Sequence, residues 1–276
     1  MKFSILLIAL IVFGCGDSEE SKADFAQTVP TDSKPDQKRQ EEIINEHLKN
    51  GAWKYQMMSQ EWQQEIDKGL AKDSTIAYLW QQKAMPWLKM RKYEVGIEYL
   101  DKAVKYDAQK WQDYRAFTKC IFAKTYEDAI VDFEDYKKKF GYGYVMDHTY
   151  DFYIALSYLQ LNEFEKAEQI FQADYERQAE KWGKDNLHHL DLFYYGISKY
   201  ELKKYEEAIE LFDMALEIYP DFSEVHLYKA VCLRKLGRKE EAKEYDILAE
   251  ENGRKGNTIN EANAKYEMYP YQWKWQ

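Results

Sequence analysis

Residues 189–221, HLDLFYYGISKYELKKYEEAIELFDMALEIYPD, decide the fold of this chain. The stretch predicts one helix-turn-helix unit of about 34 residues, and weaker copies of it fill most of the sequence. A unit of this kind cannot bury its apolar face alone, so copies stack side by side into a solenoid with an extended concave surface. Surfaces of this shape typically hold other macromolecules.

Small residues recur where the two helices of each unit must approach closely. When five units are aligned, twelve of the fifteen close-approach positions hold Ala or Gly. Phe117, Tyr136 and Asp174 occupy the other three. The small positions are Ala84, Gly96, Ala103, Ala129, Ala155, Ala167, Gly196, Ala208, Ala215, Ala230, Ala242 and Ala249. Ala and Gly are far more frequent at these positions than in the whole sequence, which predicts tight helix pairing throughout the stack.

The pattern resembles the tetratricopeptide repeat family over residues 77–253, and Tyr93, Tyr126, Phe164 and Tyr205 fill its aromatic position at the start of the second helices. The resemblance implies an all-α fold, a right-handed α-solenoid of about five helix pairs. We expect a degenerate opening pair at 37–76 and a capping helix with an aromatic tail at 258–276. The expected repeats are 77–109, 110–147, 148–188, 189–222 and 223–257.

Three stretches depart from a regular repeat. Extra residues at 140–148 and 180–189 predict longer second helices in the second and third units, with a turn at Gly141–Gly143. Pro86 is expected to kink or shorten the first helix of the first unit. At the C-terminus, aromatic residues alternate with other residues over 269–275. These rings either cap the last helix pair or lie in the concave groove or against a partner.

The first residues predict an export signal. Lys2 precedes an apolar run at residues 3–13 that is too short to span a membrane, and Gly14-Cys15 follows. This arrangement resembles the lipobox of bacterial lipoproteins, which implies a signal peptide at 1–14 and an acylated Cys15 followed by a polar tether to residue 36. We therefore expect lipid anchoring in the bacterial outer membrane, facing the periplasm or the cell surface. The alternative is an ordinary signal peptide with an incidental cysteine.

The charge of the chain bears on its partners, and its cysteines bear on its packing. The formal net charge is −10, which argues against nucleic acid because phosphate backbones require clustered Lys and Arg. Cys120 and Cys232 fall in the first helices of different units, too far apart for a disulfide, and are expected to be packed thiols.

The family resemblance also implies which residues line the groove, since fixed positions of each first helix face it. The residues expected to contact a partner are Tyr78, Trp111, Tyr114, Phe152, Phe193, Tyr200 and Arg234. Trp and Tyr are frequent hot-spot residues of interfaces. The alternative is that about half of these rings pack between repeats instead.

No motif in the sequence predicts catalysis. The histidines of His188-His189 and of the Asp147–Asp151 stretch lie beside predicted loops, where solvated side chains are expected rather than a metal site. The sequence has no phosphate-binding loop and no nucleophile elbow. We expect no enzyme activity, no cofactor and no small-molecule substrate.

Three functions fit these observations. The leading hypothesis is a membrane-anchored adaptor that holds a protein or peptide partner in the cell envelope. A second is a lipoprotein of the outer-membrane assembly type, on architecture alone. A third is capture of glycans, whose rings stack on exposed aromatic faces.

Overall fold

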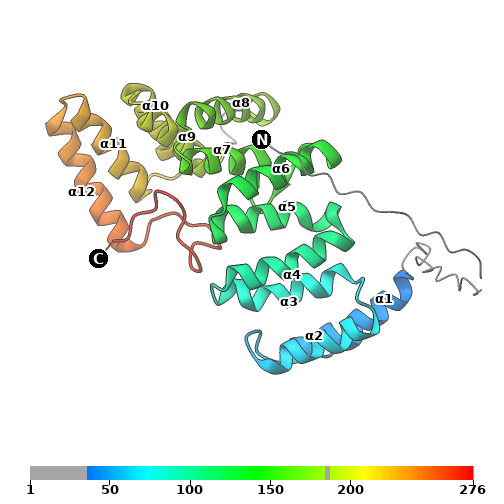
Figure 1. Cartoon of the computed structure of the whole chain (residues 1–276). Coiled ribbons are helices and arrows are strands. Elements are labelled where there is room, and N and C mark those ends of the chain that lie inside the picture. Colours follow the sequence, from blue (N-terminus) through cyan, green and yellow to red (C-terminus); the bar gives the residue numbers. More distant parts are fainter. Residues whose placement is uncertain (1–35, 184–186, 276) are drawn as a thin grey trace, which may run out of the picture. The chain divides into compact units, whose positions relative to one another are not determined.

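The computed structural model describes residues 36–183 and 187–275, and most of this part is helical (Figure 1). The predicted signal segment, Cys15 and nearly all of the tether lie outside the described residues. An opening unit at residues 37–72 is followed by five helix pairs. The opening unit consists of α1 Gln37–Ile44, a π-helical turn Asn45–Lys49, a 3-10 turn Ala52–Lys54 and α2 Gln60–Lys72.

The five pairs stack in chain order, because each first helix packs on its own second helix and on the second helix of the preceding pair. Two of the first helices are capped at their N-termini by the side chain of the residue that precedes them. Asp107 and Thr149 accept hydrogen bonds from backbone N–H groups in the first turns of the helices that follow them. The pairs are α3 Ala77–Lys89 with α4 Tyr93–Tyr106, α5 Ala108–Thr118 with α6 Tyr126–Phe140, α7 Tyr150–Gln160 with α8 Phe164–Trp182, α9 His189–Glu201 with α10 Tyr205–Ile218, and α11 Ser223–Lys235 with α12 Lys239–Lys255.

The small residues lie where the helices touch, which confirms the predicted all-α solenoid. All twelve are buried. A Cβ atom added to Gly196 of α9 would lie 2.5 Å from Cε1 of Phe212 in α10, and one on Gly96 would lie 2.4 Å from Cδ2 of Leu88. Both distances are well below van der Waals contact, so the backbones approach closer than a larger residue allows.

The turns between paired helices share a feature that the sequence did not predict. In every pair the residue two positions before the second helix has a positive φ, between 58° and 82°. Only the last of these residues is a glycine, although glycine adopts this conformation most readily. The five are Arg91, Lys124, Asn162, Lys203 and Gly237.

The extra residues of the second and third repeats are used in different ways. α6 has 15 residues, close to the 14 of α4, and the following stretch forms an antiparallel hairpin of β1 Tyr144–Val145 and β2 His148–Thr149. The prediction of a longer second helix was therefore wrong for the second repeat. It was correct for the third, because α8 runs for 19 residues.

Two further expectations, the shortening at Pro86 and the C-terminal helix, need correction. α3 continues through Pro86 to Lys89 and has 13 residues, so the proline does not shorten the helix. The short helix expected near the C-terminus is absent from residues 256–275, which form successive turns such as the bond from Tyr266 N–H to the carbonyl of Asn263. In the second repeat a π-helical turn, Lys119–Ala123, begins two residues after the bulky Phe117.

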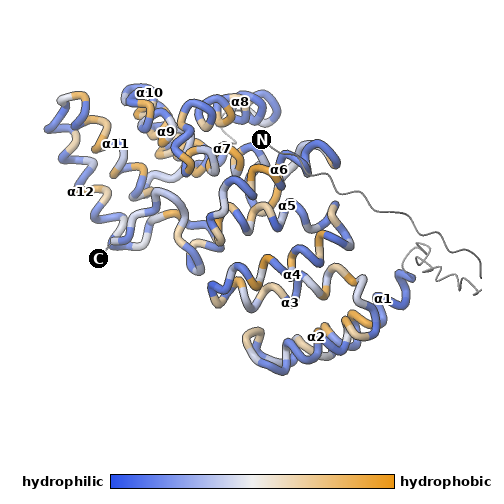
Figure 2. The backbone as a smooth tube through the Cα atoms, in the orientation of Figure 1, coloured by the Kyte–Doolittle hydropathy of each residue, from blue (hydrophilic) through white to orange (hydrophobic). Residues whose placement is uncertain are grey.

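The apolar core runs through the last four pairs and is joined by the C-terminal segment, since Ile259 and Tyr269 belong to the same cluster as the α7 and α9 rings. Hydrophobic residues gather around α7 and α9 in Figure 2. The opening unit has its own cluster, which Ile76 and Leu79 connect to α3. Among residues 36–183 and 187–275, none of the helices combines the length and apolar character needed to cross a membrane. Cys120 and Cys232 are both buried free thiols, as predicted.

Candidate binding face and its C-terminal tail

Three of the predicted groove residues form an aromatic ladder on α3 and α5. Tyr78 and Trp111 are stacked, with ring centroids 6.0 Å apart and planes within 5°, and Tyr114 meets Trp111 edge-on at 6.2 Å. The ammonium of Lys110 lies 5.7 Å from the Tyr78 ring and 5.4 Å from the Trp111 ring. All three rings are half-buried. The ladder therefore has ring surface left for a partner.

Two other predicted groove residues have no exposed side-chain surface. Phe152 and Phe193 are fully buried, which corrects the expectation that they contact a partner. Phe152 packs on Tyr194 at 5.6 Å, and Phe193 packs between Phe212 and Tyr228. Their rings fill the space between successive helix pairs, the alternative that the sequence left open.

Tyr200 and Arg234 lie at the other end of the stack. Tyr200 is half-buried against Tyr205 and Tyr228, with centroid distances of 6.2 Å and 5.6 Å. Arg234 is exposed and paired with Asp246, whose carboxylate lies 2.7 Å from its guanidinium. Neither residue belongs to the aromatic ladder.

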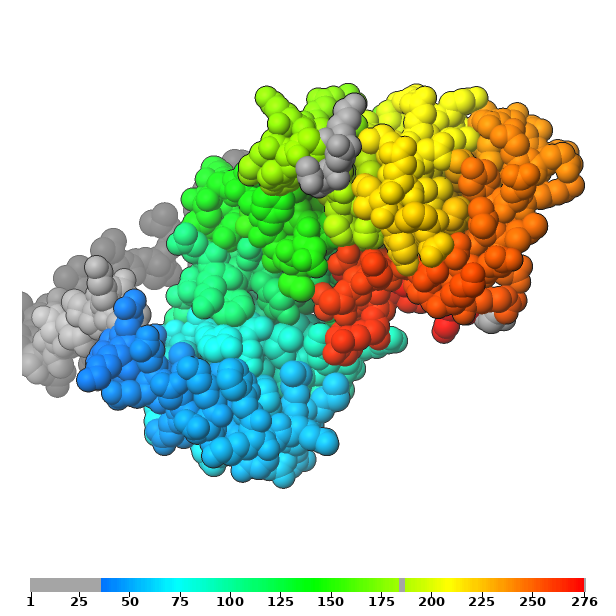
Figure 3. All heavy atoms as spheres, turned by 180° about the vertical axis from the view of Figure 1, so that it is seen from behind, coloured from blue at the N-terminus to red at the C-terminus, as the bar shows by residue number. Residues whose placement is uncertain are grey.

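The C-terminal tail, residues 257–275, lies across the inner side of the stack. Figure 1 shows it beside α11 and α12 at one end and reaching α5 at the other, and Figure 3 shows it in the hollow between these parts. The Tyr194 hydroxyl of α9 donates to the carbonyl of Pro270 at 2.7 Å, and Tyr271 donates to Glu201 at 2.8 Å. The Trp273 N–H donates to Glu224 of α11 at 3.2 Å. The sequence left two positions open for the tail, on the last helix pair or in the concave groove. Most of the tail lies in the groove.

The end of the tail also caps the last helix pair. A Cβ atom on Gly253 of α12 would lie 2.2 Å from the Trp275 ring, so the indole rests directly on the helix backbone. Both alternatives from the sequence thus hold for different parts of one segment.

Far along the stack, the tail carboxylate of Glu267 is held by the turns of the first two pairs. The Tyr93 hydroxyl donates to one carboxylate oxygen, and the Lys124 ammonium lies 2.9 Å from the other. Arg91 donates to the carbonyl of Tyr266 at 3.0 Å and lies 3.9 Å from Glu267. We call Tyr93, Arg91 and Lys124 the carboxylate cradle. Its lysine and tyrosine contacts hold the pKa of Glu267 below its usual value against the effect of burial.

Comparisons with known proteins agree with this geometry. The sequence profile of a tetratricopeptide repeat matches residues 199–245. Among solved structures, PilW, a type IV pilus biogenesis factor, superposes with a TM-score of 0.60 at 14% identity, over 77% of this chain and 94% of its own. The chain therefore contains a tetratricopeptide repeat and has the fold of a tetratricopeptide-repeat solenoid. A search of curated proteins finds no match.

Two other solved repeat proteins have the same fold. A tetratricopeptide repeat protein from Parabacteroides merdae has a TM-score of 0.58 at 14% identity, over 75% of this chain and 77% of its own. YrrB, described as having an unusual peptide-binding site, has a TM-score of 0.50 at 17% identity, over 68% of this chain and 92% of its own. At such identities the likeness concerns the fold alone.

A histidine cluster joins the third and fourth tetratricopeptide repeats to the tail. The imidazole of His148 is fully buried between two carboxylates. Its Nδ1 lies 2.6 Å from Asp191 and its Nε2 lies 3.4 Å from Glu261 of the tail. Burial opposes the charge on His148, but the charge and hydrogen bond of Asp191 outweigh it and raise the pKa to about 9. The prediction of solvated, loop-exposed histidines was wrong for His148.

The same cluster has a composition that metal ions favour, since ligand atoms of His148, His188 and Asp191 lie within 4.8 Å of one another. Both nitrogens of His148 face carboxylates, however, and Nδ1 of His188 accepts the N–H of Leu190. Burial lowers the pKa of His188, and the nearby charge of His148 acts in the same direction. This bonding describes an imidazolium held between two carboxylates, and it leaves no free lone pair on His148 for a cation.

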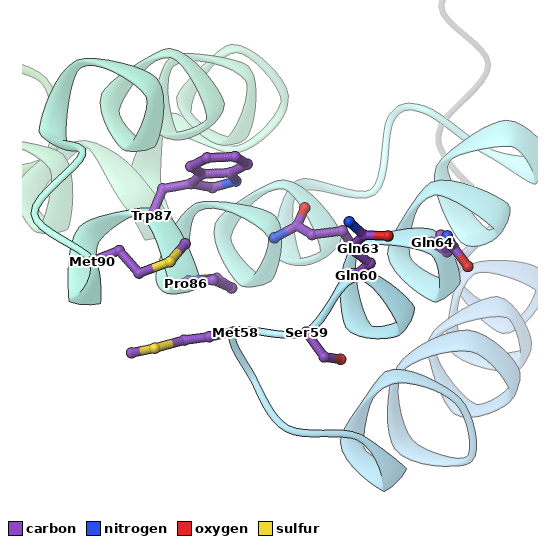
Figure 4. Close-up of a pocket in the computed structure, with 8 residues that line it drawn as sticks. All are labelled: Met58, Ser59, Gln60, Gln63, Gln64, Pro86, Trp87 and Met90. Carbon is purple, nitrogen blue, oxygen red and sulfur yellow. The ribbon is translucent and has the colours of Figure 1, made fainter.

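A separate cavity of about 330 Å³ lies between the opening unit and the first tetratricopeptide repeat (Figure 4). Met58 and Met90 flank it with Pro86 and Trp87, and glutamines of α2 form its polar side. The indole N–H of Trp87 is buried and lacks a hydrogen-bond partner among the described residues. This cavity could not be predicted from the sequence, because the residues that line it lie in two separate units.

Proposed function

We propose that the protein is a non-catalytic adaptor that binds an extended segment of a partner protein on the aromatic ladder of α3 and α5. The single observation that carries this proposal is the half-buried stack of Tyr78, Trp111 and Tyr114 on two successive first helices. Rigid aromatic rings with open faces contribute much of the binding energy at protein interfaces.

The polar groups around the ladder fit a peptide. The buried indole N–H of Trp111 has no hydrogen-bond partner among the described residues, and a carbonyl oxygen of a bound segment would reach it only after a shift of the ring. Lys110 lies over two of the rings and places a positive charge beside the site. YrrB, a solved protein of the same fold, is described as binding peptide.

Recovery of the partner from native envelopes tests this assignment. We expect Tyr78→Ala with Trp111→Ala to reduce the recovery of specifically crosslinked partner about tenfold or more, because truncating hot-spot rings typically costs about 2 kcal/mol or more. Val131→Ala, at a 65% exposed position of α6, is the matched control and should leave recovery unchanged. Equal recovery from the ladder variant, with its helical signal intact, would reject the ladder as the site.

We propose further that the adaptor is anchored by acyl chains on Cys15 in the bacterial outer membrane. The support is the order of Lys2, the apolar run 3–13 and Gly14-Cys15 in the sequence.

Labelling with radioactive palmitate tests the anchor. The wild-type protein should take up label and sediment with outer membranes, and Cys15→Ser should lose the label. Labelled Cys15→Ser protein would rule out this cysteine as the acylation site.

A further inference from the structure

The C-terminal tail is bound to the stack as a ligand is bound to a receptor. It has no regular secondary structure among residues 256–275, and side chains from several repeats hold it at separate points. Tyr269 is 3% exposed, and the carbonyl of Pro270 accepts a hydrogen bond from Tyr194 in α9. Tyr271 packs against Tyr228 of α11 at 5.8 Å and donates to Glu201.

The carboxylate cradle supplies the charged part of this recognition. Lys124 and Tyr93 contact the Glu267 carboxylate, and Arg91 holds the preceding carbonyl. Lys89 lies 3.6 Å above the Tyr266 ring, a cation-π contact. Lys124 and Arg91 therefore both lie beside one acidic residue, and Lys89 lies over the tyrosine that precedes it, in a chain whose formal net charge is −10.

The cradle is built on the turns between helices, not on the first-helix positions that face the groove. Arg91 and Lys124 occupy the same positive-φ position of the first and second pairs, with φ of 60° and 58°. The shared position presents both side chains on the same side of successive repeats, where they reach tail residues only one position apart. Lys203 holds the equivalent position in the fourth pair with φ of 62°.

The tail also contains a feature that favours release. Tyr271 is held at φ 59°, a conformation that residues with a side chain rarely adopt. Met268 and Trp273 remain exposed, at 40% and 53%. The bound segment is therefore strained at one residue and accessible at two others, so a competitor can begin to displace it from the exposed positions.

We propose that the cradle and the tyrosine-lined face of α9 and α11 form a second binding site, for a partner segment with an acidic residue between tyrosines. The protein's own Tyr266-Glu267-Met268-Tyr269 occupies this site in the free state. The site rests on the proposed function only in that the protein acts by holding segments of partners. It uses none of the ladder residues.

A peptide of residues 263–275, NAKYEMYPYQWKW, with a fluorophore at its N-terminus, is the probe. Its binding is measured by fluorescence anisotropy to the full-length chain and to full-length Glu267→Ala/Tyr269→Ala. The attached tail competes at a high effective concentration. We therefore expect the variant to bind the peptide at least about tenfold more tightly than the wild type does. Equal affinity for the two chains would overturn the proposal.

Charge controls identify the cradle as the site. Adding Lys124→Gln to the variant should weaken peptide binding about fivefold or more, because it removes a charge-assisted hydrogen bond. Lys203→Gln, at the same turn position of the fourth pair, should have no effect. Binding that is insensitive to Lys124→Gln would overturn the site. If the double variant melts early, Glu267→Gln alone should still increase affinity, and no increase would count against the proposal.

Two further measurements distinguish this proposal from the ladder assignment and from binding of the tail of a second copy. Trp111→Ala should leave peptide affinity unchanged, so a failure of the ladder assignment is visible apart from a failure of this one. The wild-type chain should elute as a monomer. A dimer that dissociates on Glu267→Ala/Tyr269→Ala would show that the tail comes from a second copy and would contradict its binding within one chain.

Discussion

At the scale of single residues, Gly196 shows how one atom sets the distance between paired helices. Its position was predicted as a close approach, and the α9 backbone does pass within contact distance of the Phe212 ring. In contrast, the buried pair of His148 and Glu261 lies 113 residues apart in sequence. No periodicity connects these two residues, so sequence reasoning placed the histidine in solvent. Local repeats predict packing positions, and they do not predict contacts made by a segment outside the repeat.

Gly196→Ala should destabilise the protein. Alanine favours a helix by about 1 kcal/mol over glycine, but the new methyl group would lie 2.5 Å from a fully buried ring that has no room to move. We expect a net loss of about 1–3 kcal/mol in the free energy of unfolding, measured by urea denaturation. Glu210→Ala, on the exposed side of α10, is the control and should change stability by less than about 0.5 kcal/mol.

The charge on His148 should make stability depend on pH. Its pKa is about 9 in the folded protein against an ordinary value of 6.5, so the folded state holds the proton more tightly. The resulting stabilisation is complete below pH 6.5 and is lost as the pH rises through 9.

Thermal melts of wild type and His148→Gln at a series of pH values test this charge. The wild type should be more stable at pH 6 by on the order of 2 kcal/mol, and the difference should shrink toward pH 9.5. A difference that stays constant over this range would mean that His148 acts by packing alone.

At the scale of elements, the helix pairs were predictable and the connections were not. The second helices begin at the predicted aromatic residues Tyr93, Tyr126, Phe164 and Tyr205. The extra residues after α6 form a hairpin, although their number alone would also fit a longer helix. The C-terminal stretch 260–268 has residues that tolerate a helix, but its side chains bind separate repeats and this fixes a series of turns instead.

Gly253→Ala should release the end of the tail without unfolding the repeats. The added methyl group would overlap the Trp275 ring, which is only partly buried and can move away. We expect trypsin to cleave after the exposed Lys274 several times faster, as followed by intact-mass measurement, while the helical signal is retained. Glu251→Ala, exposed on the same helix, should not change the rate. Equal cleavage rates for the wild type and Gly253→Ala would contradict the packing of Trp275 on Gly253.

At the scale of the whole molecule, the stack presents two different surfaces. The ladder on α3 and α5 consists of half-buried rings, whereas the face along α9 and α11 is covered by the protein's own tail. The solenoid followed from the sequence, and three of the predicted partner-binding residues, Tyr78, Trp111 and Tyr114, are half-buried and contact one another. Phe152 and Phe193 did not stay on the surface, because the central helices are buried on nearly all sides and use their groove positions for packing.

Hydrogen exchange on the full-length chain tests most directly whether the cradle holds the tail on the stack. The wild type is compared with Arg91→Gln/Lys124→Gln, which keeps most of each side-chain stem and removes both charges. We predict that backbone amides of residues 259–275 exchange about tenfold faster or more in the variant, with the exchange of α9 and α11 nearly unchanged. Equal exchange of the tail in the two proteins would contradict it.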